Sequence, residues 1–130
     1  MTDPHLICVV EDDPDIRETL QALLELEGYR VVTAANGLEA LRLLDRIKGS
    51  GLPALVLLDL MMPVMNGSDF VAAARRLYST TELPIIVLSA IAEQAKVFAT
   101  QLAGILRKPV HVDYLLETVR RFSTPKEQSA

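Results

Sequence analysis

The chain has 130 residues, of which 50% are hydrophobic, and it carries a formal net charge of -4. This length suits a single domain, and the hydrophobic content excludes a protein that is mostly disordered. Nucleic-acid-binding proteins typically have a basic face, and an acidic net charge gives no reason to expect one. We therefore expect no direct contact with DNA or RNA.

Apolar runs and helically spaced segments alternate along the chain. In chain order we predict a strand at 6–10, a helix around 16–24, a strand at 31–32, a helix around 40–47, a strand at 55–58, a helix around 70–78, a strand at 85–88, a weaker strand at 104–106 and a helix around 112–119. The segment 92–102 has no clear pattern. Because three of the runs are apolar throughout, the order predicts an α/β fold with a doubly wound, five-stranded parallel sheet.

Turn and capping residues agree with these boundaries. Asp13 followed by Pro14 is typical of a helix start, and Gly28 and Gly49 are placed to close the first two helices. We assign 1–122 to one domain and 123–130, which is polar, to a tail or the stub of a linker.

The first residues, the lengths of the apolar runs and the single cysteine indicate the cellular compartment. Residues 1–5 have no basic region followed by an apolar stretch, so they do not predict a signal peptide. No apolar run is long enough to span a bilayer. Cys8, the single cysteine, lies in an apolar run and is predicted to be a buried thiol. We expect a cytoplasmic protein that makes no membrane contact.

Reactive side chains follow four of the five predicted strands. Glu11, Asp12 and Asp13 follow the first, and Asp59, Ser89 and Lys108 end the third, fourth and fifth. The carboxyl ends of parallel strands share one edge of a sheet, where α/β proteins bind ligands. Clustered carboxylates need a cation beside them, or some of them must be protonated. Oxygen ligands without histidine or cysteine favour Mg²⁺ over zinc.

These residue types also suit phosphoryl transfer. Asp59 could attack phosphorus as a nucleophile, while Lys108 and Ser89 bind oxygens of the transferred group. Each residue alone has a simpler interpretation: Asp13 as a helix cap, Ser89 as a turn residue and Lys108 as a surface lysine. Their joint placement at strand ends favours the functional interpretation.

Other residues with ligand chemistry lie outside this group. We interpret His5 and His111 as surface residues. Met61, Met62 and Met65 lie in one loop, where packing beneath the loop is favoured over ligation of a metal by sulfur.

Four motifs together resemble the response-regulator receiver domain of two-component signalling. They are Val-Val-Glu-Asp-Asp-Pro at 9–14, Leu-Leu-Asp-Leu-Met-Met-Pro-Val-Met-Asn-Gly at 57–67, Leu-Ser-Ala at 88–90 and Lys-Pro at 108–109. The resemblance runs from about Leu6 to Phe122. It implies a flavodoxin-like fold with strand order 2-1-3-4-5.

The resemblance assigns a role to each motif residue. It implies that Asp59 is the phosphoacceptor, that Lys108 binds the phosphoryl group and that Ser89 is the switch hydroxyl. Mg²⁺ would be held by Asp12, by Asp59, by the backbone carbonyl of Met61 and through water by Glu11. The remaining implied roles are structural: Ala90 keeps access open, Pro109 follows a cis peptide bond and Gly67 permits the turn into the third helix. A Mg²⁺-dependent phosphorylation switch is implied, not an enzyme beyond slow self-phosphorylation and self-dephosphorylation.

The implied partners are a sensor histidine kinase or phosphotransfer protein, which donates the phosphoryl group from a phosphohistidine, and a downstream protein that reads the changed face. The family also allows a dimer that forms on phosphorylation. The motifs themselves name neither partner.

The sequence departs from the family in two places. Ile105 stands where an aromatic residue usually pairs with the switch hydroxyl, and an aliphatic side chain cannot make the same rotation. The segment between Ser89 and Lys108 is also shorter than the family's by a few residues. We therefore expect a non-standard output face.

Met61 and Ile91, each two positions beyond a site residue, lie where the family tunes the access of water to the phosphoryl group. Both are apolar, which predicts slow self-dephosphorylation.

Three other readings stay open on the sequence alone. The chain could be the receiver module of a larger regulator or hybrid kinase. It could be a phosphatase that forms an aspartyl-phosphate, although Met61 occupies the place of the expected general acid. It could also be a pseudo-receiver that works without phosphorylation.

Overall fold

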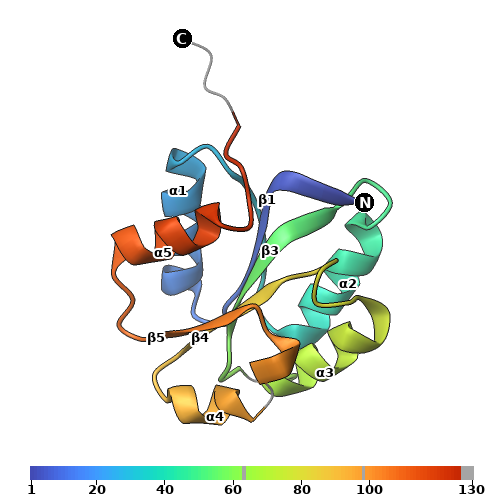
Figure 1. Ribbon diagram of the computed structural model, residues 1–130, viewed down its shortest axis with the longest axis vertical. Coiled ribbons are helices and arrows are strands. Elements are labelled where there is room, and N and C mark those ends of the chain that lie inside the picture. Colours follow the sequence, from blue (N-terminus) through green and yellow to red (C-terminus); the bar gives the residue numbers. More distant parts are fainter. Residues whose placement is uncertain (63, 98, 127–130) are drawn as a thin grey trace.

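The computed structural model describes residues 1–62, 64–97 and 99–126. Its elements alternate in chain order (Figure 1): β1 (Thr2–Val10), α1 (Pro14–Leu26), β2 (Arg30–Ala34), α2 (Gly37–Ile47), β3 (Leu52–Asp59), α3 (Gly67–Leu77), β4 (Ile85–Ser89), α4 (Ala92–Lys96), a 3₁₀ turn η1 (Ala99–Gln101), β5 (Gly104–Arg107) and α5 (Val112–Arg120). Among the described residues, no helix is long and apolar enough to cross a membrane.

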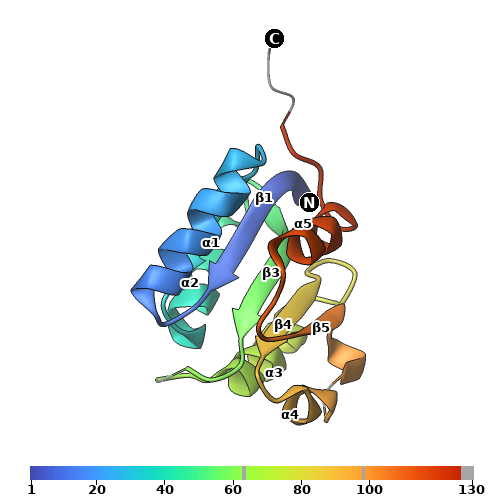
Figure 2. The same ribbon diagram turned by 90° about the vertical axis from the view of Figure 1, so that its left-hand side faces the viewer.

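The five strands form one parallel sheet in the order β2-β1-β3-β4-β5. Helices α1 and α5 cover one face of the sheet, and α2 and α3 cover the other (Figures 1 and 2). The predicted fold class and strand order are therefore confirmed.

Strand β3 is the centre of the core because side chains along a strand point alternately to the two faces of the sheet. All eight of its residues are buried. Val56 and Leu58 pack on the α2–α3 side, while Leu55 and Leu57 pack on the α1–α5 side. Strand β3 thus buries apolar side chains on both faces of the sheet, and for this reason its sequence shows no alternation of apolar and polar residues.

Strand β1 begins earlier than predicted. Thr2 and Asp3 pair with Leu52 and Pro53, and the register then shifts before Ile7. Because these first residues are polar and join the sheet through their backbone, no apolar pattern marked them.

Cys8 lies near the carboxyl end of β1, the strand between β2 and β3, and is fully buried as predicted. Burial raises the pKa of its thiol to about 12. The thiol is therefore protonated in the folded protein, and its reactivity is low.

The predicted helix start at Asp13 is confirmed, since its carboxylate accepts hydrogen bonds from the amides of Asp15 (2.8 Å) and Ile16 (3.3 Å). Gly28 closes α1 with a φ of 96°. After α2, however, the left-handed position belongs to Gly51 (φ 135°), not to Gly49. A side chain at Gly51 would also press on Asp3, at 3.3 Å.

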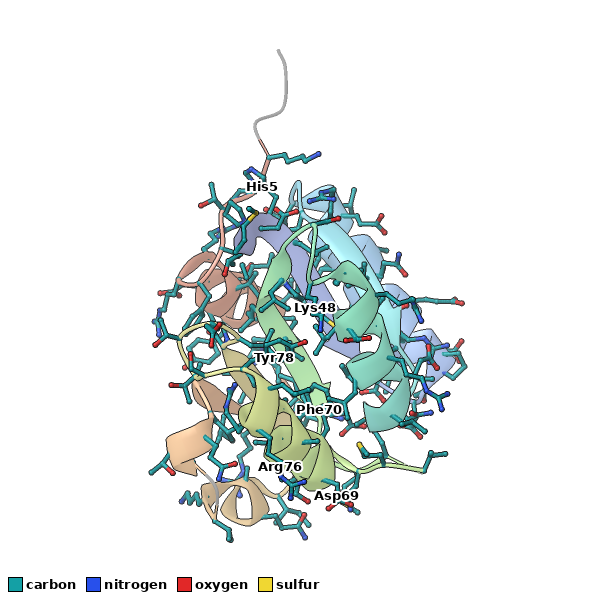
Figure 3. The ribbon with its side chains drawn as sticks, turned by 90° about the vertical axis from the view of Figure 1, so that its right-hand side faces the viewer. His5, Lys48, Asp69, Phe70, Arg76 and Tyr78 are labelled. Carbon is teal, nitrogen blue, oxygen red and sulfur yellow. The ribbon has the colours of Figure 1, made fainter. Side chains whose placement is uncertain are left out.

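The described part of the predicted tail, 123–126, lies against the sheet. The amide of Thr124 donates to the carbonyl of Pro4 (2.8 Å), and that of Lys126 donates to the carbonyl of Gly28 (2.9 Å). The ring of His5 is half-buried and its Nδ1 lies 2.7 Å from the carbonyl of Thr124. Figure 3 places His5 at the end of the molecule where this segment leaves. The predicted residues 127–130 lie outside the described ranges.

Candidate functional site

The carboxyl ends of the strands bring the predicted site residues to one edge of the sheet. Glu11 and Asp12 directly follow β1, Asp59 ends β3, Ser89 ends β4 and Lys108 directly follows β5. The arrowheads of β1 and β3 point to this same end of the molecule in Figure 2.

Three carboxylates converge there. Glu11, Asp12 and Asp59 each offer an oxygen, and these oxygens all lie within 4.8 Å of one another. Glu11 and Asp59 are buried, whereas Asp12 is exposed. Burial, with the nearby charge of Asp59 as the second cause, raises the pKa of Glu11 from 4.5 to about 7.

Lys108 supplies positive charge beside the acids. Its Nζ lies 3.5 Å from Oδ1 of Asp59. The backbone fixes the start of this side chain, since the amide of Lys108 donates to the carbonyl of Ser89 (2.9 Å). The peptide bond between Lys108 and Pro109 is cis, as the resemblance to receiver domains implies.

The chemistry of the acidic group fits a hard divalent cation. Oε2 of Glu11 is buried and has no hydrogen-bond partner among the described residues, so an oxygen is free to face a cation or its water. The group consists of carboxylates alone, which suits Mg²⁺ rather than zinc. The backbone carbonyl of Met61 as a further ligand stays a prediction.

The loop between β3 and α3 is held close to Asp59. The amide of Met61 donates to Oδ1 of Asp59 (3.3 Å), and the amide of Gly67 donates to the carbonyl of Leu60 (2.9 Å). A Cβ on Gly67 would lie 2.7 Å from the Cα of Leu60. Gly67 has no positive φ, so it permits the turn into α3 through close backbone approach and not through a left-handed conformation.

Positive φ in this loop falls instead on Val64, at 67°. A β-branched residue there is strained. Pro63, which belongs to the loop motif, lies outside the described residues. Of the three loop methionines, Met62 is buried and Met65 packs against the core, as predicted, but Met61 is 69% exposed.

Ser89 is buried, and its hydroxyl is turned onto the following loop. Its Oγ donates to the carbonyl of Ile91 (3.0 Å) and accepts from the amide of Ile91 (3.1 Å). Ala90 is exposed. Ile105, at the position that usually carries an aromatic residue, is half-buried and packs against the core on the α2–α3 side.

Sequence reasoning missed two residues that shape the site. The guanidinium of Arg17 donates to the carbonyls of Glu11 (2.9 Å) and Asp12 (3.4 Å), which holds the turn after β1. Asn66 caps α3 by accepting from the amide of Asp69 (2.9 Å). An asparagine before a helix is a readable capping signal, but the contact of Arg17 depends on how the turn folds back.

An apolar groove opens beside the site. A cavity of about 480 Å³ between α1 and the segment after β5 is lined by Ile16, Leu20, Leu88 and Val110, with Glu11 and Lys108 among its other walls. A second cavity, of about 330 Å³, shares the same four apolar residues and extends the groove to Leu115 on α5.

Comparisons with a family model and with known proteins point to the same family. The model of the response regulator receiver domain matches residues 7–120. The chain is 39% identical to the "Uncharacterized 14.6 kDa protein in sodA1 3'region" of Leptolyngbya boryana, over 89% of this chain and 88% of that protein. It is 33% identical to response regulator Rre1 of Synechocystis sp., over 100% of this chain but 56% of that protein.

Solved structures agree with this family. Response regulator TrrA of Thermotoga maritima, in complex with Mg²⁺-BeF, has a TM-score of 0.76 and 32% identity, and the match covers 94% of this chain and 99% of that one. The receiver domain of sensor histidine kinase PA1611 of Pseudomonas aeruginosa, with a magnesium ion in its active-site cleft, has a TM-score of 0.78 and 28% identity, covering 92% and 98%.

Proposed function

The chain belongs to the response regulator receiver domain family of two-component signalling, and we propose on this basis that Asp59 is its phosphoacceptor. The general role of the family is a phosphorylation switch. The observation that carries the assignment to Asp59 is the convergence of its carboxylate with those of Glu11 and Asp12 and with the ammonium of Lys108.

The chain's own residues suit each part of the transfer. An oxygen of Asp59 forms a bond to phosphorus while the bond to the phosphohistidine nitrogen breaks, and the released imidazole takes up a proton from solvent. Lys108, 3.5 Å from Asp59, binds one oxygen of the phosphoryl group. The hydroxyl of Ser89 donates to another oxygen after it leaves the carbonyl of Ile91.

Mg²⁺ is the cofactor that these residues would hold. Asp12, Asp59 and the carbonyl of Met61 would bind it directly, and Glu11 would bind through water. When bound, the ion neutralises charge on a phosphoryl oxygen. Oε2 of Glu11, which has no hydrogen-bond partner in the described part of the chain, supports this arrangement, because such an atom is stabilised by a cation or its water.

A histidine kinase or phosphotransfer protein is the proposed donor. The apolar groove between α1 and the segment after β5 reaches Lys108, so a protein surface packed into it would bring its phosphohistidine near Asp59. The chain spans about half the length of Rre1, and the downstream partner of this receiver is therefore proposed only as a protein that reads its altered face.

The phosphorylated state is proposed to be long-lived. The apolar side chains of Met61 and Ile91 are 69% and 52% exposed at the edge that carries Asp59. Neither can orient a water molecule toward phosphorus by hydrogen bonding, so self-dephosphorylation is slow.

Mass spectrometry after incubation with a small phosphodonor tests the assignment. With Mg²⁺ present, we expect the protein to gain the mass of one phosphoryl group. Asp59→Asn should abolish the gain, whereas Asp69→Asn, which changes an exposed acid on α3, should leave it intact. No gain in the unmodified chain would favour a pseudo-receiver, and a gain that persists in Asp59→Asn would place the acceptor elsewhere. Repeated turnover of a phosphate ester would favour a phosphatase.

A further inference from the structure

The sulfur atoms of the chain differ in their access to solvent, and all five sulfur-bearing residues lie in the described ranges. Met61 is 69% exposed, whereas Met62 is buried and Met65 packs against the core. Cys8 is fully buried, and its protonated thiol lacks the thiolate character that oxidants attack. Apart from Met1 at the start of the chain, Met61 is therefore the sulfur-bearing residue most open to solvent.

Met61 is also fixed beside the proposed phosphoacceptor. Its amide donates to Oδ1 of Asp59 (3.3 Å), so the residue can leave that carboxylate only by breaking this hydrogen bond. The preceding residue, Leu60, accepts from the amide of Gly67 through its carbonyl (2.9 Å), which further fixes the loop. An exposed thioether thus lies two residues from the group that would carry phosphorus.

The side chain of Met61 meets polar groups at the surface. It lines a cavity of about 310 Å³, whose other walls are formed by Leu60, Met62, Asn66, Ser68 and Gln94. Because one water molecule occupies about 30 Å³ in the liquid, this cavity has room for a small oxidant such as hydrogen peroxide. The amides of Asn66 and Gln94 and the hydroxyl of Ser68 can donate hydrogen bonds to an oxygen atom added to the sulfur.

Oxidation would change the property of Met61 that is proposed to slow self-dephosphorylation. A thioether is a weak hydrogen-bond acceptor, whereas oxidation to the sulfoxide makes the side chain polar. A polar oxygen at this position can accept a hydrogen bond from a water molecule and orient it toward phosphorus on Asp59. The two oxidation states of Met61 therefore predict two different lifetimes of the phosphorylated state.

We propose that Met61 is a site of reversible oxidation by peroxides and that its sulfoxide shortens the lifetime of phosphorylated Asp59. The sulfur attacks one oxygen of hydrogen peroxide, an S–O bond forms as the O–O bond breaks, and the second oxygen leaves as water after proton transfer. Sulfur loses two electrons, and the peroxide accepts them. A methionine sulfoxide reductase, which draws its electrons from a thiol, restores the thioether and releases the oxygen as water. This proposal rests on the phosphorylation of Asp59 proposed above.

Limited treatment of the folded chain with hydrogen peroxide, followed by peptide mass mapping, tests the site. Trypsin releases the three loop methionines in one peptide, 49–75, so fragment ions must locate the added oxygen. We expect Met61 to be oxidised several-fold faster than Met62 or Met65, since susceptibility follows exposure. In urea-unfolded chain the three rates should become similar. Oxidation of Met65 before Met61 in the folded chain would overturn the proposal.

Phosphate release from the phosphorylated chain measures the consequence. Chain that is oxidised before phosphorylation should release phosphate several-fold faster than untreated chain, and treatment with a methionine sulfoxide reductase and a thiol should restore the slow rate. In Met61→Leu, peroxide should not change the release rate of that variant. The control Met62→Leu, a change of similar volume at the buried neighbour, should keep the full response to peroxide.

A further variant reads the polar group without any oxidant. Met61→Gln places an amide oxygen close to where the sulfoxide oxygen would lie, and it should release phosphate several-fold faster than Met61→Leu. Selective oxidation of Met61 without faster release would overturn this proposal and leave the proposed function standing, as would an undiminished response to peroxide in Met61→Leu. Absence of phosphoryl mass gain in the untreated chain would overturn both.

Discussion

Lys108 reaches Asp59 across an intervening strand: Nζ of Lys108 lies 3.5 Å from Oδ1 of Asp59, although β4 separates β3 from β5 in the sheet. The strand between them contributes Ser89, whose carbonyl accepts a hydrogen bond from the amide of Lys108. Ser89 therefore holds the backbone of the lysine, while Asp59 attracts its ammonium.

Removal of the ammonium should slow phosphorylation without unfolding the protein. We expect Lys108→Ala to reduce the rate of phosphoryl gain from a small phosphodonor by about 10²-fold, the size of effect seen when one charge-stabilising donor is removed. Mass spectrometry at timed intervals measures this rate. Lys96→Ala, at an exposed lysine of α4, is the matched control and should keep the original rate.

Without metal, stability should fall as pH rises through the weakly acidic range. The pKa of Glu11 is raised from 4.5 to about 7 by burial and by Asp59, against the opposing charge of Lys108. The folded state therefore binds the proton of Glu11 more tightly than the unfolded state does. The stabilisation that this proton gives to the folded state is full below pH 4.5 and lost as the pH rises through about 7. Urea unfolding in chelator, compared between pH 5 and pH 8, measures this slope of the unfolding free energy against pH. Glu11→Gln should flatten this slope, and an unchanged slope would contradict the assignment.

Gly67 should tolerate no side chain. The Cβ of Gly67→Ala would lie 2.7 Å from the Cα of Leu60 and 3.0 Å from the carbonyl oxygen of Asp59, and these backbone atoms can yield only by moving the loop. We expect a loss of about 1–3 kcal/mol in the free energy of unfolding and slower phosphorylation of Asp59. Gly49→Ala, where a Cβ would meet no described atom within 4 Å, is the control. Equal effects of the two changes would refute the packing argument.

Val64→Gly should stabilise the protein. Val64 has a φ of 67°, a conformation that costs a residue with a side chain roughly 1–2 kcal/mol and costs glycine little. After the entropy of the added glycine is subtracted, a net gain of about 0.5–1 kcal/mol is expected in urea unfolding. Val97→Gly is matched in residue type and exposure, but its φ is -58°, so it should destabilise.

The lifetime of the phosphorylated state should depend on Met61 and Ile91. Polar side chains at these exposed positions could orient water toward phosphorus, so Met61→Asn and Ile91→Glu should each speed the loss of the phosphoryl group several-fold. A time course of phosphate release from phosphorylated protein measures the rate. Unchanged rates in both variants would show that apolar character here does not set the lifetime.

The main features of the fold follow from local patterns in the sequence. The apolar run within β3 predicts a strand buried on both faces, and the alternation of runs with helical segments predicts the parallel sheet. Once the strands are parallel, Asp59 and Lys108 must end at the same edge, so their placement there could be predicted from the positions of the strands. The strand order that brings them close came from the resemblance to receiver domains.

What the sequence could not predict depends on contacts between distant backbones. Thr2 pairs in the sheet through main-chain atoms, and Gly67 is needed because Leu60 approaches it closely. Arg75 reads in the sequence as an ordinary surface arginine, and its hydrogen bond to the carbonyl of Gln101 appears only because α3 lies beside η1. The partner of the Ser89 hydroxyl is likewise set by the path of the loop.

The single thiol, near the carboxyl end of β1, gives this protein a built-in chemical probe of opening. Since Cys8 is fully buried and burial raises the pKa of its thiol to about 12, an alkylating reagent can modify it only while β1 is transiently exposed. The rate of modification therefore counts opening events directly, without an added label. One mass spectrum can record that count and the phosphorylation of the same molecule together.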